Sequence, residues 1–173
     1  MKTLLLMRHA KSDWNANYGS DHERPLNGRG ERSARLMGRL VKGMDLVPQH
    51  VVSSTAVRAR TTARLASEAG GWGSSMALEP DLYGTGAESV ISIGAAAPDV
   101  ERLMLVGHQP TWSMVVYRLT GARVDMKTAS VAVIEVMADQ WSELPGLHAV
   151  LAGLHHPRTY FGSEWDDVPG SVS

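Results

Sequence analysis

Short runs of consecutive apolar residues alternate along this chain with longer segments that have helical periodicity. Runs of consecutive apolar residues are typical of strands that are buried on both faces of a parallel sheet. The two clearest runs lie at residues 4–7 and 103–106. Shorter candidate strands lie at residues 51–53, 76–78, 131–136 and 149–154.

The segments between these runs predict helices. Apolar residues at the spacing i, i+3, i+4 and i+7 lie on one face of a helix, and this spacing occurs twice. The predicted helices span residues 31–44, 56–69 and 87–97, and a further helix begins near Pro110. Ser54 or Thr55 is the expected N-cap of the second helix. Strands alternating with helices predict an α/β fold, a three-layer sandwich with a mostly parallel central sheet and helices on both faces.

The length of the chain indicates one domain. We expect that domain to span residues 1–156 of the 173 and to be followed by a polar, turn-rich tail at 157–173. Tyr160, Phe161 and Trp165 are the side chains with which the tail could pack on the domain. Because 43% of the residues are hydrophobic, the chain can bury a sizeable core without a disulfide or a structural metal.

Charge and cysteine content exclude several classes of function. The net charge is −1, so the chain lacks the overall basic excess expected of a nucleic-acid-binding or anionic-membrane-binding protein. It contains no cysteine, which excludes thiolate catalysis and cysteine-based metal sites. No apolar stretch approaches the roughly 20 residues of a membrane helix, and the run at 4–7 is too short for a signal-peptide core. We therefore expect a cytoplasmic protein. We also expect a monomer, because no long apolar seam is left unassigned.

Candidate catalytic residues follow three of the predicted strands. In an α/β sheet, ligands bind beyond the carboxyl ends of the strands, and here those ends carry Arg8-His9, Arg58 and His108. An arginine fork matches two phosphate oxygens, and its charge keeps a neighbouring histidine neutral, as a nitrogen nucleophile requires. Arg58 lies in the first turn of a predicted helix, a position that favours anions. Taken singly, His9 and His108 could be core histidines, and Arg58 could be a solvated surface arginine.

Three segments of the chain resemble the motifs of one family. Leu-Leu-Met-Arg-His-Ala-Lys-Ser at residues 5–12 is similar to the first motif of the histidine phosphatase superfamily, the phosphoglycerate mutase-like proteins. Residues 53–63 and 106–110 resemble its second and third motifs. The short chain, the Arg-His-Ala-Lys form of the first motif, and Arg24-Pro25-Leu26 followed by Gly30 resemble the SixA-like phosphohistidine phosphatase branch. The resemblance extends from residue 4 to about residue 136.

This resemblance implies a fold and a set of residue roles. The fold would be phosphoglycerate mutase-like, and His9 would be the nucleophile that becomes phosphorylated. Arg8, Arg58 and His108 would bind the phosphoryl group, and Arg24 would contact the substrate near the entrance of the site. Water would then hydrolyse the phosphohistidine intermediate, with no metal and no cofactor.

The chain departs from the family pattern at two points. Position 10 is alanine where much of the superfamily has glycine, and its methyl group fits if the backbone is not left-handed. The acidic proton donor of larger members has no equivalent in its usual local pattern. Asp81 and Glu79 are the nearest candidates, although each fits a surface charge better than a proton donor.

The missing acid favours one class of substrate. A placed acid accelerates the departure of an alkoxide by about 10²–10⁴-fold, whereas an imidazole leaving group needs this help less. The expected substrate is therefore a phosphohistidine in a signalling protein, such as a histidine-phosphotransfer domain. The alternatives are a phosphatase of the same mechanism that acts on a small phosphorylated metabolite, a non-catalytic phosphate-binding module, and a metal-dependent hydrolase. The last is disfavoured because the chain has no His-Glu-x-x-His motif.

Overall fold

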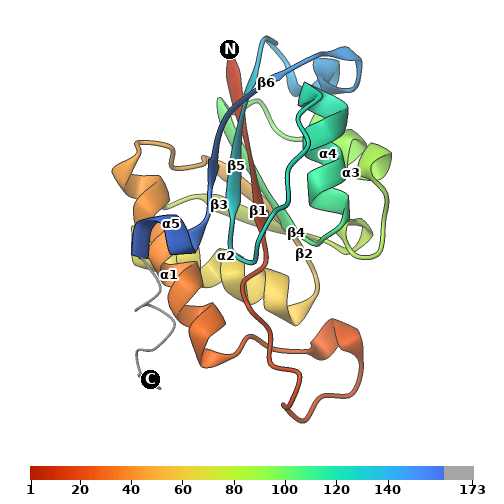
Figure 1. The fold of residues 1–173 in the computed structure, drawn as a ribbon. Helices are drawn as coiled ribbons and strands as arrows, with labels where there is room; N and C mark the ends of the chain where they lie inside the picture. Colours follow the sequence, from red (N-terminus) through yellow and green to blue (C-terminus); the bar gives the residue numbers. More distant parts are fainter. Residues whose placement is uncertain (162–173) are drawn as a thin grey trace.

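Six strands form one central sheet that is covered by helices on both faces (Figure 1). The computed structural model describes residues 1–161. The strands are β1 (Lys2–Arg8), β2 (His50–Ser54), β3 (Ser75–Glu79), β4 (Arg102–Gly107), β5 (Val131–Val136) and β6 (Val150–His155). Their order across the sheet is β3-β2-β4-β1-β5-β6. The pairs from β3 to β1 are parallel, and the pairs β1–β5 and β5–β6 are antiparallel, so the prediction of a mostly parallel α/β sheet is confirmed.

Helices α1 and α2 pack on one face of the sheet, and α3 and α4 pack on the other. The helices are α1 (Gly28–Gly43), α2 (Val57–Gly70), α3 (Ala87–Ala95), α4 (Thr111–Thr120) and α5 (Pro157–Phe161). Short 3₁₀ turns lie at η1 (Asp21–Glu23), η2 (Pro80–Leu82) and η3 (Trp141–Gly146).

The central position of β1 explains its unbroken apolar run. Leu4 and Leu6 belong to the core cluster under α3 and α4, whereas Leu5 and Met7 belong to the cluster under α1 and α2. All four side chains are fully buried. Successive side chains of a strand point to opposite faces, so a strand covered on both sides must be apolar at every position.

The predicted helices differ from the structure mainly at three points. The first helix begins at Gly28 rather than at residue 31, because the side chain of Asn27 caps it by accepting a hydrogen bond of 2.8 Å from the Gly30 amide. The predicted cap of α2 by Ser54 or Thr55 is wrong, since Ala56 is the N-cap residue and makes no side-chain cap. Helix α3 ends at Ala95, two residues before the predicted end at 97.

The beginning of the predicted tail is helical. Pro157 is buried in α5, and Phe161 packs against the core cluster under α1 and α2. Trp165 and the rest of the segment after 161 lie outside the described residues. In the part of the chain that the structure describes, no helix has the length and apolar character to span a membrane.

Candidate active site

The sheet register brings the predicted residues of the first and third motifs together. Arg8 at the end of β1 pairs with Gly107 at the end of β4, so His9 and His108 leave the sheet side by side. Their ring centroids lie 5.3 Å apart. Arg58 arrives from the first turn of α2, which follows β2 on the other side of β4. These four side chains line one cavity of about 720 Å³ at the carboxyl edge of the parallel strands.

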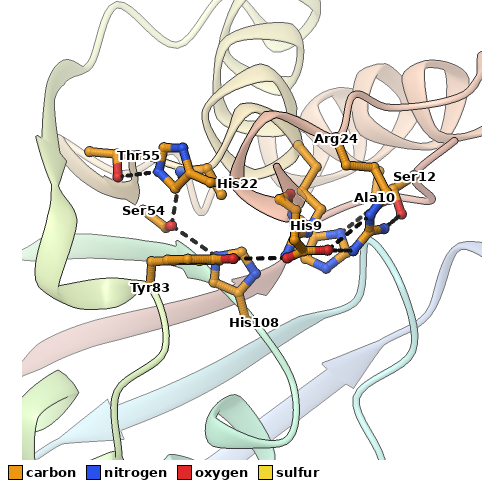
Figure 2. Close-up of polar contacts among 12 residues, drawn as sticks. His9, Ala10, Ser12, His22, Arg24, Ser54, Thr55, Tyr83 and His108 are labelled. Carbon is orange, nitrogen blue, oxygen red and sulfur yellow. Dashed lines mark hydrogen bonds and ion pairs between the residues drawn. The ribbon is translucent and has the colours of Figure 1, made fainter. Parts of the chain in front are cut away.

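His9 is held from both sides by backbone hydrogen bonds. Its amide donates to the Gly107 carbonyl at 2.9 Å, and its carbonyl accepts from the Ala129 amide at 3.1 Å. Its Nδ1 lies 2.7 Å from the Ala10 carbonyl oxygen (Figure 2). A carbonyl can only accept, so Nδ1 carries the proton and donates it. The lone pair is then on Nε2, the ring nitrogen that is available as a nucleophile.

The surroundings of His9 keep its ring neutral. His9 is 8% exposed. This burial is the main reason why the pKa of its ring is lowered to about 3. The hydrogen bond to Ala10 opposes the shift, while His108, Arg58 and Arg8 add to it through their charges. At neutral pH the imidazole is therefore uncharged, which is the state in which a histidine can attack phosphorus.

His108 is oriented by a buried hydroxyl and an aromatic ring. Its Nε2 lies 2.8 Å from Ser54 Oγ, at the end of β2, as Figure 2 shows. The ring of Tyr83 packs edge-on against it, with centroids 5.4 Å apart. Burial first, and then the charge of Arg58, lower the pKa of His108 to about 4. A neutral ring in this position can donate one hydrogen bond into the cavity, and it carries no charge that would repel Arg8 and Arg58.

Two guanidinium groups in the cavity wall have donors without acceptors. Arg8 donates from Nη1 to the Met126 carbonyl at 2.8 Å, and Arg58 donates from Nη1 to the Asp21 carbonyl at 2.7 Å. The Nε of each arginine is buried and has no hydrogen-bond partner among the described residues. Leaving a buried donor unpaired costs about 1–3 kcal/mol, and more for a charged group. Both side chains line the cavity, so an oxyanion between them would lie between two positive charges.

A carboxylate that the sequence did not single out ties the cationic side chains together. Asp21 Oδ2 accepts from Arg58 Nη2 at 3.0 Å and from the Tyr83 hydroxyl at 2.9 Å. Asp21 Oδ1 accepts from Arg24 Nη2 at 2.8 Å. These donors, that of Arg24 first, hold the pKa of Asp21 well below its usual range. Asp21 is therefore ionised at neutral pH and cannot serve as a proton donor.

Arg24 lies at the cavity wall but is occupied by protein partners. Besides Asp21, its guanidinium donates to the Ser12 hydroxyl and stacks over Trp14, with 3.6 Å between the guanidinium carbon and the ring centroid. The residue is 5% exposed. Its guanidinium adds positive charge near the cavity. Its contacts with Ser12, Trp14 and Asp21 stabilise the loop between β1 and α1.

The alanine at position 10 fits without backbone strain. Ala10 is fully buried, and its amide donates to Thr62 Oγ1 at 2.9 Å. Among the described residues, the non-glycine positions with positive φ are Asp45 and Ala129. Ala10 is therefore not left-handed, and the condition under which its methyl group fits is met.

The two candidate proton donors do not reach the cavity. Glu79 accepts a hydrogen bond from the Asp81 amide at 3.0 Å, and both residues lie outside the cavity wall. Asp81 instead lines a neighbouring hollow. No aspartate or glutamate of the described residues lines the cavity itself, and no group of three or more potential metal ligands occurs in that part of the chain.

Sequence reasoning missed Asp21, Tyr83 and Ser54. Asp21 had one detectable signal, its i, i+3 spacing from Arg24 in a polar loop. Ser54 was assigned a capping role, although its hydroxyl contacts His108. Tyr83 gave no signal, because the turn that carries it after β3 follows no pattern that sequence reveals.

Comparison with known proteins identifies the family. Residues 4–84 match the model of the histidine phosphatase superfamily (branch 1). An uncharacterized chloroplastic protein of Arabidopsis thaliana is 30% identical over 82% of this chain and 70% of its own length. An uncharacterized protein of Mycobacterium tuberculosis is 35% identical over 88% of this chain and its full length. The chain belongs to the histidine phosphatase superfamily, and these matches support phosphatase activity.

Solved structures assign the chain to a branch of that family. A protein of Nakamurella multipartitia that is provisionally assigned as the phosphohistidine phosphatase SixA has 29% identity and a TM-score of 0.80, over 90% of this chain and 96% of the other. Its counterpart from Agrobacterium tumefaciens has 26% identity and a TM-score of 0.78, over 90% and 98%. These likenesses place the chain in the SixA-like branch.

Proposed function

We propose that this protein is a metal-independent phosphatase that uses His9 as its nucleophile and acts on phosphohistidine in a protein. The observation that carries the proposal is the juxtaposition, at the wall of one cavity, of a neutral His9, whose lone pair is on Nε2, with the guanidinium groups of Arg8 and Arg58. A phosphoryl group bound between Arg8 and Arg58 lies between two positive charges and presents its phosphorus to His9.

The first step transfers the phosphoryl group to the enzyme. The Nε2 lone pair of His9 attacks phosphorus, and the bond between phosphorus and the leaving nitrogen breaks with its electron pair on that nitrogen. Arg8 and Arg58 neutralise the equatorial oxygens, and His108 donates one hydrogen bond to them. Positioning and charge neutralisation supply most of the catalysis in such a transfer.

The second step releases phosphate. A water oxygen attacks the phosphorus of phosphorylated His9, the bond from phosphorus to Nε2 breaks, and the ring recovers its lone pair. The water gives up one proton, so the products are inorganic phosphate and the starting enzyme. Because Nδ1 keeps its proton throughout, the Ala10 carbonyl fixes the ring in the same tautomer for both steps.

The absence of a proton donor supports phosphohistidine as the substrate. Asp21 is ionised, and no carboxyl group of the described residues lines the cavity. An alkoxide leaving without a proton is a poor leaving group, whereas a phosphorylated imidazole can take its proton from solvent at its second nitrogen. The two similar proteins of known structure are provisionally assigned as phosphohistidine phosphatases. The proposed partner is a phosphorylated histidine-phosphotransfer domain, in the cytoplasm.

The test is release of inorganic phosphate from a phosphorylated histidine-phosphotransfer domain, with chelator present and an alkyl phosphate in parallel. We expect wild type to act on the phosphoprotein faster than on the alkyl phosphate, and His9→Ala to lose at least about 10³-fold. An alkaline denaturing quench during turnover should trap one phosphoryl group on wild type in an alkali-stable form that acid then releases. The matched control is His148→Ala, which changes an exposed histidine outside the cavity.

Each other outcome has a defined meaning. If only small phosphate esters are cleaved, and still only with His9 present, the mechanism stands and the substrate is a phosphorylated metabolite. If wild type binds the phosphoprotein without releasing phosphate, the chain is a binding module. Activity of His9→Ala equal to that of wild type would refute the proposed nucleophile.

A further inference from the structure

Trp14 is a large aromatic side chain that the proposed mechanism leaves unexplained. It lies in the loop between β1 and α1 and lines the same cavity as His9. The residue is 69% exposed, although an indole ring removed from water contributes several kcal/mol in a core. An exposed tryptophan at the wall of a binding cavity is typical of an anchor for a ligand or a partner.

One face of the Trp14 ring is fixed by a rigid partner. The guanidinium carbon of Arg24 lies 3.6 Å from its centroid. Arg24 is itself buried and held by Asp21 and the Ser12 hydroxyl. With this face covered and most of the residue exposed, the open face of the indole is the other one. Its orientation is set before any ligand binds, which lowers the entropy cost of stacking on it.

The rest of the cavity wall suits a planar ring near the phosphate. Leu82, Tyr83 and Pro110 supply apolar surface beside the cations. Tyr83 is itself fixed, since its ring packs edge-on against His22 with centroids 5.0 Å apart and its hydroxyl donates to Asp21. A substrate whose phosphoryl group lies between Arg8 and Arg58 therefore extends toward aromatic and apolar side chains.

We propose that Trp14 is a specificity-determining residue whose open face stacks on a planar ring carried next to the phosphoryl group. This inference rests on the proposed function, in which that ring is the imidazole of a phosphohistidine. An alkyl phosphate offers no flat surface to the indole. Trp14 thus favours substrates in which an aromatic ring is joined to phosphorus directly or through one oxygen.

The test compares leaving groups rather than overall activity. Values of kcat/KM are measured for phosphoimidazole, phenyl phosphate and glycerol phosphate with wild type, Trp14→Leu and Trp14→Phe. An aromatic stacking pair contributes about 0.5–1.5 kcal/mol, which corresponds to a loss of up to about tenfold. We expect kcat/KM of Trp14→Leu to fall about fivefold to tenfold on the two planar substrates. The corresponding fall on glycerol phosphate should be smaller by a factor of at least about three. Trp14→Phe should recover most of the loss.

Two controls separate stacking from a structural role and from failure of the proposed function. Met137→Ala removes an equally exposed side chain outside the cavity, 69% exposed, and should change nothing. In a His9→Ala background, calorimetric affinities for phosphoimidazole and glycerol phosphate give the same comparison without turnover. Equal losses of kcat/KM on planar and alkyl substrates would show that Trp14 acts only by holding Arg24. No loss of kcat/KM on any substrate would also overturn the proposal.

Discussion

At the scale of single residues, the buried ring of His9 makes stability depend on pH. Its pKa is about 3 in the folded chain and about 6.5 in the unfolded one. Between these values the unfolded state binds more protons, so stability falls as the pH is lowered through this window. At pH 5 the contribution of His9 alone is about 2 kcal/mol of destabilisation relative to pH 8.

Replacing His9 tests this linkage. His9→Asn removes the titrating ring, so we expect its free energy of unfolding to fall less than that of wild type between pH 8 and pH 5. Urea unfolding at the two pH values measures the difference. His108 and Asp21 are present in both proteins, so both pH profiles contain their contributions. Parallel pH profiles would show that His9 is protonated alike in the folded and unfolded states.

Asp21 predicts a second effect at this scale, on substrate binding. Asp21→Asn replaces one carboxylate oxygen by a donor that faces Arg58, Arg24 or the Tyr83 hydroxyl, all of which are donors themselves. Arg58 then loses the group that orients it, and we expect kcat/KM to fall about tenfold, mainly through KM. Asp81→Asn, which lies outside the cavity, is the matched control. An unchanged KM would mean that Arg58 is positioned without Asp21.

At the scale of elements, the first turn of α1 touches the loop that follows the nucleophile. A methyl group on Gly30 would lie 2.1 Å from the Lys11 carbonyl oxygen, whereas nothing lies within 4 Å of the same position on Gly28. We expect Gly30→Ala to destabilise the fold by about 1–3 kcal/mol through overpacking, and Gly28→Ala to be neutral or slightly stabilising. Thermal unfolding of the two variants measures this. Equal melting temperatures would show that the loop yields without cost.

The same contact shows what sequence could and could not predict about the elements. The sequence pattern located every strand within two residues, most clearly β1 and β4, because a strand covered on both faces is apolar at nearly every position. The start of α1 was missed, since Gly28 and Gly30 indicate a loop by propensity while the Asn27 cap and the tight packing of Gly30 decide otherwise. The carboxyl ends of the predicted strands indicated four residues of the cavity. Asp21 and Trp14 were not predicted, because they lie in a loop whose path depends on tertiary contacts.

At the scale of the whole molecule, the sequence pattern predicted a mostly parallel sheet but neither the strand order nor the two antiparallel pairs. The antiparallel pairing of β5 with β1 depends on connections that carry no periodic signal. The extent of the domain is a question of the same kind. The sequence pattern predicts a domain that ends at residue 156 and a tail that can pack on it. Pro157 is buried and Phe161 packs on the cluster under α1 and α2.

Truncation distinguishes these two boundaries. A chain ending at residue 161 and a chain ending at residue 156 differ only by α5, so their difference in stability reports that helix alone. Partial burial of Phe161 and Pro157 should make the shorter chain less stable by about 1–2 kcal/mol. Urea midpoints of the two chains give the measurement, and the slopes of the transitions check that both unfold cooperatively. A lower midpoint for the shorter chain would extend the domain through Phe161. Coincident midpoints would return the boundary to residue 156, because α5 would then rest on the core without contributing to its stability.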